Sequence, residues 1–167
     1  TFWRNANFLK IQQHGESQKA FLQLFGECLM KQCGLDIDKC GNPAGPYIYL
    51  DDILFSGNRI KNDLTSWIAK NAPTNATVHI IVMAVHTGGE YYVRTSLEKV
   101  SSEAKKNISL KIWRAAEFEN RKSEKDNSEV LWPSVLPDDA RLAAYLAEPT
   151  KFPFQTRRPG GKLGPFS

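Results

Sequence analysis

Apolar residues recur along the chain with two different spacings. Short apolar runs rich in aromatic and β-branched residues are typical of strands, and they occur at residues 8–11, 47–50, 78–85 and 108–115. Between these runs, apolar residues recur at helical spacing over residues 19–33, 60–70 and 91–106. This order predicts an α/β fold: an open, mainly parallel sheet of about four to five strands with right-handed crossovers and helices on both faces.

The last part of the chain has a different composition. A short helix is predicted over residues 138–148, and the residues after it are rich in Pro and Gly. Several basic residues gather in this final stretch: Lys151, Arg157, Arg158 and Lys162. We therefore predict an α/β domain over residues 1–148 and a basic Pro/Gly-rich tail over residues 149–167.

Length and composition exclude several classes of protein. The 167 residues suffice for one domain with a core, and no apolar run approaches the ~18 residues of a membrane helix, so no membrane association is predicted. Cys28, Cys33 and Cys40 are odd in number and lack paired zinc-site spacing, which favours free thiols in a reducing, cytoplasmic compartment. Because the sequence begins with Thr1 and stops without a closing element, we expect natural sequence beyond both ends.

The charge balance is mildly basic, with a net charge of +4. This charge suits an anionic ligand, and it also allows nucleic-acid binding through the basic tail and exposed aromatic residues such as Trp113 or Phe152. A charge of +4 on this length is modest, so nucleic-acid binding ranks behind binding of a small anion. The alternative for any single Lys or Arg is an ordinary solvated surface.

Residues 47–59 form the stretch with the clearest chemistry. Asp51 and Asp52 follow a buried apolar strand, and Ser56 and Gly57 precede a helix. Ligands of open α/β sheets bind outside the carboxyl ends of the strands, and a helix N-terminus attracts phosphate. The stretch therefore predicts a site that joins two carboxylates to a phosphate cradle. The alternative is ordinary turn and capping chemistry, which Asp also suits.

Two further turns between a strand and a helix are expected to open at the same edge of the sheet. The first contains Gly15, Ser17 and Gln18, with Ser17 as a plausible N-cap, and the second is the run His86-Thr87-Gly88-Gly89. Glycine lets a backbone approach a ligand closely. The alternatives here are a capped helix without a ligand and a plain turn.

The central stretch resembles the phosphoribosyl-pyrophosphate motif of type I phosphoribosyltransferases: four apolar residues, two acids, two variable residues and a small phosphate loop. The chain as a whole resembles the phosphoribosyltransferase-like family associated with bacterial conflict and anti-phage systems. The segments that carry this resemblance are residues 2–5, 11–18, 51–59, 86–92 and 130–133. It spans most of the chain and implies a phosphoribosyltransferase-like fold.

The resemblance also implies roles for individual residues. Asp51 and Asp52 would take the ribose hydroxyls, face Mg²⁺ directly or through water, and stabilise the positive charge that develops on the sugar. The 5′-phosphate would lie on Ser56, Gly57, Asn58 and Arg59. The pyrophosphate would face Gly15, Ser17 and Gln18, and further ligand contacts would come from His86, Gly88 and Gly89.

Arg59 departs from the motif, because the family places Thr or Ser at this position. Its guanidinium either binds phosphate or fills the pocket and pairs with Asp51 or Asp52. The first outcome favours a phosphoribosyltransferase-like effector, a toxin component of an anti-phage system, that binds phosphoribosyl pyrophosphate or a nucleotide. The second favours a catalytically inactive module that binds a nucleotide or a protein partner within a defence complex. No base-transfer signature is recognisable.

Overall fold

The computed structural model describes residues 2–13, 15–118 and 137–147. These residues fall into two units, Thr1–Glu117 and Phe118–Ser167, and each is described by itself. The helices of the first unit are α1 (Phe2–Asn5), α2 (Ser17–Cys33), the 3-10 turn η1 (Ile37–Lys39), α3 (Asn58–Lys70) and α4 (Thr87–Glu103). The strands are β1 (Asn7–Phe8), β2 (Tyr47–Leu54), β3 (Asn75–His86) and β4 (Asn107–Phe118). The second unit contributes α5 (Ala140–Ala147), and the predicted tail over 149–167 lies outside the described residues.

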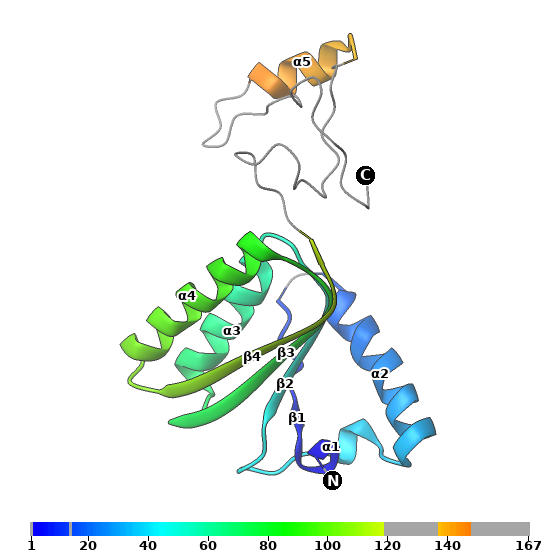
Figure 1. Ribbon diagram of the computed structural model, residues 1–167, viewed down its shortest axis with the longest axis vertical. Helices are drawn as coiled ribbons and strands as arrows, with labels where there is room; N and C mark the ends of the chain where they lie inside the picture. Colours follow the sequence, from blue (N-terminus) through cyan, green and yellow to red (C-terminus); the bar gives the residue numbers. More distant parts are fainter. Residues whose placement is uncertain (1, 14, 119–136, 148–167) are drawn as a thin grey trace. The chain divides into compact units, whose positions relative to one another are not determined.

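The sheet confirms the predicted fold class. Its four strands are parallel and lie in the order β1-β2-β3-β4, with helices on both faces (Figure 1). β2 and β3 are paired from Tyr47 opposite Val78 to Leu54 opposite Val85. β4 lies at the edge, as its alternating sequence predicts.

Each face of the sheet has its own apolar core. On one face, α3 and α4 bury Leu64, Trp67 and Leu97 against the sheet. On the other face, α2 buries Leu22 against the strands, among them Ile48 of β2 (Figure 1). Alternate residues of β2 therefore serve opposite cores, which explains why the strand is apolar throughout its first half.

The helices on opposite faces overturn one expectation about connectivity. Each crossover steps in the same direction across the sheet, yet α2 lies on the face opposite α3 and α4 (Figure 1). Crossovers on opposite faces then have opposite hands, so the three cannot all be right-handed. The right-handed preference arises from strand twist, and β1 is paired over only Asn7 and Phe8, so the preference is weakest at the first crossover.

Two element boundaries differ from the sequence prediction in ways that matter for the site. β2 continues through Asp51 and Asp52 to Leu54, because its pairing with β3 continues past the acids. α4 begins at Thr87 rather than near Tyr91, so the paired glycines at positions 88 and 89 lie within its first turn.

Candidate functional site

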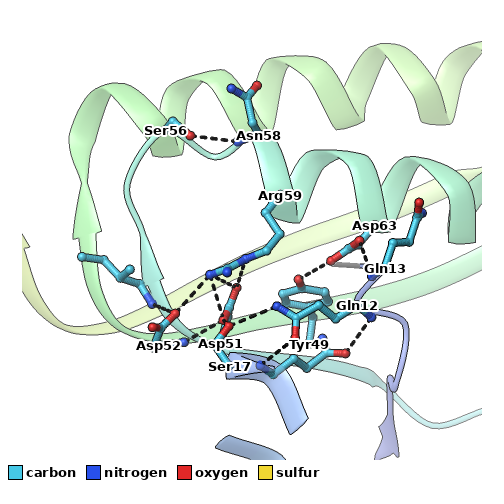
Figure 2. A network of polar contacts seen from close by, with 12 residues as sticks. Gln12, Gln13, Ser17, Tyr49, Asp51, Asp52, Ser56, Asn58, Arg59 and Asp63 are labelled. Carbon is cyan, nitrogen blue, oxygen red and sulfur yellow. Dashed lines mark hydrogen bonds and ion pairs between the residues drawn. The ribbon is translucent and has the colours of Figure 1, made fainter. Parts of the chain in front are cut away.

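An arginine at the start of α3 holds both acids of β2. Figure 2 shows the Arg59 side chain extending from the helix towards the two carboxylates. Its Nε donates to Oδ2 of Asp51 at 3.1 Å, and its Nη2 donates to Oδ1 of Asp51 and Oδ1 of Asp52, each at 3.2 Å. The guanidinium therefore bridges the two carboxylates that the sequence singles out.

Asp51 and Asp52 lie in different environments. Asp51 has no exposed side-chain surface, and this burial raises its pKa above the ordinary value, although a hydrogen bond from Ser17 (2.8 Å) and the charge of Arg59 act in the opposite direction. Asp52 is exposed. Its partial desolvation acts to raise its pKa, but hydrogen bonds and the charge of Arg59 outweigh this and lower it. Asp51 is thus the acid whose charge depends most on its partners.

The turn before α2 supports Asp51 from the other side. The Ser17 hydroxyl does not cap α2, whose N-cap is Glu16, but donates to Asp51, and Gln12 Nε2 donates to Ser17 Oγ at 3.1 Å. Gln18 is 2% exposed, and its Oε1 accepts from the backbone N–H groups of Ile11 and Gln12. These residues order the turn and hold the buried carboxylate in place.

An open cavity of about 680 Å³ lies beside this cluster. It is lined by Gln13, Gly15, Arg59, Asn62, Asp63, Thr65 and Ser66. A Cβ at Gly15, which has φ +90°, would lie 3.7 Å from Nη1 of Arg59. Nη1 has no hydrogen-bond partner among the residues that the structure describes, so the guanidinium keeps one donor group for a molecule in the cavity.

Tyr49 and Asp63 form a buried pair that sequence reasoning missed. The Tyr49 hydroxyl donates to Asp63 Oδ2 at 2.8 Å, and the backbone N–H of Gln13 donates to Asp63 Oδ1 at 3.2 Å (Figure 2). Burial, followed by the hydrogen bond to Asp63, strongly raises the pKa of Tyr49. The sequence does indicate a buried partner for Asp63. This acid falls within the apolar stripe of α3, between Ile60 and Trp67, where a carboxylate needs a hydrogen-bond partner.

Removal of the Tyr49 hydroxyl is expected to cost stability in a pH-dependent way. Tyr49→Phe leaves Asp63 short of one donor, so the free energy of unfolding at pH 7 should fall by about 1–2 kcal/mol. Because the folded-state pKa of Tyr49 is raised, its contribution is complete below the unfolded pKa of ~10 and is lost above it. Urea unfolding should therefore show a smaller difference between the two proteins above about pH 10 than at pH 7.

The matched control is Tyr47→Phe on the same strand. The Tyr47 ring packs on Trp67, and its hydroxyl has no hydrogen-bond partner among the described residues. This change should alter stability by about 0.5 kcal/mol or less. Equal losses for the two variants would show that the bond to Asp63 contributes nothing.

The predicted phosphate loop packs closely on α4. A Cβ at Gly57, which has φ +76°, would lie 2.5 Å from Val93 Cγ2, and a Cβ at Gly89 would lie 1.9 Å from the backbone oxygen of Phe55. The Phe55 ring lies 5.2 Å from that of His86. Both glycines are therefore required for contact between the loop and the helix, which is a structural role in addition to the ligand role predicted for them.

The structure thus divides the predicted site residues into two groups. In the first group, Gly15 and Arg59 line the cavity, Asp51 and Asp52 contact Arg59, Ser17 contacts Asp51, and Gln18 orders the turn. The second group consists of residues at the loop and the start of α4: Ser56, Gly57, Asn58, His86, Gly88 and Gly89. In Figure 2, Ser56 and Asn58 lie at the top of the view, away from the converging carboxylates.

The donor set at the two acids does not fit Mg²⁺ as it stands. Mg²⁺ requires nearly octahedral oxygen ligands, and the guanidinium of Arg59 already contacts Asp51 and Asp52. Within the described residues, no group of three or more His, Cys, Asp or Glu side chains is arranged to hold a metal ion.

No described helix is long and apolar enough to cross a membrane.

Comparison with known proteins identifies the family. The PRTase-CE family model matches residues 1–162 of the 167. No curated protein and no solved structure matches the chain. The match includes β2 with its two acids, Arg59, and the turns at the starts of α2 and α4, and it agrees with the resemblance that the sequence motif carries. The chain belongs to the PRTase-CE family and contains a phosphoribosyltransferase-like domain.

Proposed function

We propose that this domain binds a ribose-phosphate ligand, phosphoribosyl pyrophosphate or a nucleotide, and does not transfer the phosphoribosyl group. Family membership supports a ribose phosphate as the ligand class. The cavity beside Gly15 and the spare Nη1 of Arg59 support an anionic group in that ligand. The exposed carboxylate of Asp52 remains able to accept a hydroxyl hydrogen bond.

The bridge from Arg59 to both acids is the observation that supports binding without transfer. Phosphoribosyl transfer develops positive charge on the sugar, and carboxylates stabilise that charge only if they are not already neutralised. Arg59 contacts Asp51 at 3.0 Å and Asp52 at 3.2 Å, so a cation lies where the reacting sugar would need negative charge. This arrangement supports our proposal of binding without transfer.

One observation favours an active transferase as the second candidate. The Arg59 side chain is 38% exposed and lines the cavity, so it has room to turn towards a ligand phosphate and leave the acids. Such a movement would return both carboxylates to the roles that the resemblance implies. The two candidates differ in whether pyrophosphate is released.

Calorimetric titration with ribose 5-phosphate and with phosphoribosyl pyrophosphate tests the proposal. We expect both to bind, and the double variant Asp51→Asn/Asp52→Asn to bind at least about tenfold more weakly, a change of about 1.4 kcal/mol. The variant Glu98→Gln/Glu103→Gln changes the net charge equally on the exposed part of α4 and should bind like the parent chain. A coupled assay should detect no pyrophosphate release.

Two results would contradict the proposal in different ways. Failure of both ligands to bind would reject a ribose-phosphate site. Release of pyrophosphate that depends on Asp51 and Asp52 would instead identify a transferase.

We further propose that the domain works with a protein partner in a bacterial anti-phage complex. This part of the proposal rests on the resemblance to conflict-system phosphoribosyltransferase-like proteins.

The basic tail, with Arg157 and Arg158, is the proposed nucleic-acid contact and lies outside the described residues. Loss of salt-dependent nucleic-acid binding on deletion of residues 157–167 is the expected result in a filter-binding assay.

A further inference from the structure

We infer that the Arg59 guanidinium takes the place of a divalent cation in this site, so that the ligand binds without a metal ion. The inference rests on the proposed function and concerns the charge of the same site. The resemblance assigns Asp51 and Asp52 to Mg²⁺, but in the structure the side chain of Arg59 contacts both acids.

The position of Arg59 is unfavourable unless the acids are its partners. It is the second residue of α3, where the positive end of the helix dipole repels a cation. Asp51 is fully buried, and a buried carboxylate without a cation is strongly disfavoured. The carboxylate of Asp51 offsets the unfavourable position of the Arg59 charge, and Arg59 offsets the unfavourable burial of the Asp51 charge. The ion pair is therefore expected in the folded domain without a ligand.

The geometry of the bridge leaves little opportunity for a metal ion. Both Nε and Nη2 of Arg59 point at Asp51, and Nη2 also reaches Asp52. Mg²⁺ would have to approach the same oxygens to about 2.0–2.1 Å while next to a fixed positive charge. Three hydrogen bonds and like-charge repulsion therefore oppose metal binding together.

A metal ion in such a site would neutralise the acids and would also bind an anionic group of the ligand. The Arg59 guanidinium can make this second contact as well. Nη1 is the one nitrogen of Arg59 not directed at the acids, and it faces the turn at Gly15. A planar guanidinium that is fixed on one edge by carboxylates can donate charge-assisted hydrogen bonds from its other edge. A phosphate oxygen in the cavity beside Gly15 would meet those donors.

Titration of the ligand-free chain with Mn²⁺ tests metal exclusion directly, because Mn²⁺ prefers the same oxygen ligands and its binding is detected by water proton relaxation. We expect no Mn²⁺ site in the parent chain and one site in Arg59→Ser, which carries a residue type that the motif prefers at this position. Arg59→Ser/Asp51→Asn should lose the site again. Arg59→Lys keeps a cation and should exclude Mn²⁺ like the parent. A Mn²⁺ site in the parent chain that depends on Asp51, or no site in a folded Arg59→Ser variant, would overturn the inference.

A second measurement uses ribose 5-phosphate as the probe, with and without a chelator. The dissociation constant of the parent chain should change by less than about twofold between excess EDTA and excess Mg²⁺, whereas that of Arg59→Ser should be at least about tenfold weaker in EDTA. Tenfold weaker binding of the parent in EDTA would contradict metal independence. If the parent binds no ribose phosphate at all, the proposed function fails, and the Mn²⁺ titration still decides whether Arg59 excludes a metal.

Discussion

Gly89→Ala is expected to destabilise the first unit by about 3 kcal/mol, because the new Cβ would overlap a backbone atom that cannot move by itself. The Cβ would lie 1.9 Å from the Phe55 oxygen and 2.9 Å from Leu54 Cδ2. Relief requires displacement of α4 from the end of β2, and both belong to the main apolar core. Urea unfolding followed by circular dichroism measures this loss.

The neighbouring glycine provides the matched control. A Cβ at Gly88 would meet only the His86 ring, at 3.2 Å, and Gly88 is exposed in the same turn of the same helix. Gly88→Ala should therefore change stability by about 1 kcal/mol or less, with either sign. If both variants unfold at the same urea concentration, the close contact between Gly89 and Phe55 does not exist in solution.

Loss of the Arg59 side chain is expected to be the second large effect. Arg59→Met preserves much of the length of the side chain but leaves Asp51 buried without its cation, which should cost about 2–3 kcal/mol at pH 7. We place the value at the low end for a buried pair because Arg59 is partly exposed. Arg94→Met is the control: Arg94 is 37% exposed, and its partner Glu90 keeps a second arginine, Arg114, at 3.2 Å.

The same variant should show a characteristic dependence on pH. Burial already raises the pKa of Asp51, and removal of the Arg59 charge raises it further. A carboxyl whose folded-state pKa is raised favours the folded state once it is protonated, so the deficit of Arg59→Met is largest at neutral pH and shrinks as the pH falls through that pKa. Unfolding curves measured between about pH 7 and pH 4 test this. A deficit that stays constant across that range would show that Asp51 is not the source.

The repeated sequence pattern was sufficient to predict the sheet and its helices. The run 78–85 lies within β3, and the helical spacing after residue 19 lies within α2. What the pattern could not reveal is where the first crossover goes. The spacing of apolar residues in α2 shows that one side is buried, but it carries no information about which face of the sheet is covered.

The sequence motif singled out three charged residues that contact one another in the structure, but it did not predict all of their contacts. The motif located Asp51, Asp52 and Arg59, and pairing of the arginine with the acids was one of the two outcomes left open. Ser17 was expected to cap α2, but it is the first residue of that helix, after the N-cap Glu16, and its hydroxyl donates a hydrogen bond to the buried carboxylate of Asp51 instead. Such competition between local and tertiary partners is decided only in the folded chain.

The order of strands has a consequence for how the domain forms. Neighbours in the sheet are neighbours in the chain, so each strand can pair with the one made before it. Pairing between strands that follow one another in the chain closes shorter loops than a rearranged strand order would, and this limits the loop-closure entropy that must be overcome. The hydrogen-bonded residues around the ion pair all lie between Gln12 and Asp63, so every one of them is synthesised before β3 begins at Asn75, and the cluster needs no contact from the later part of the chain.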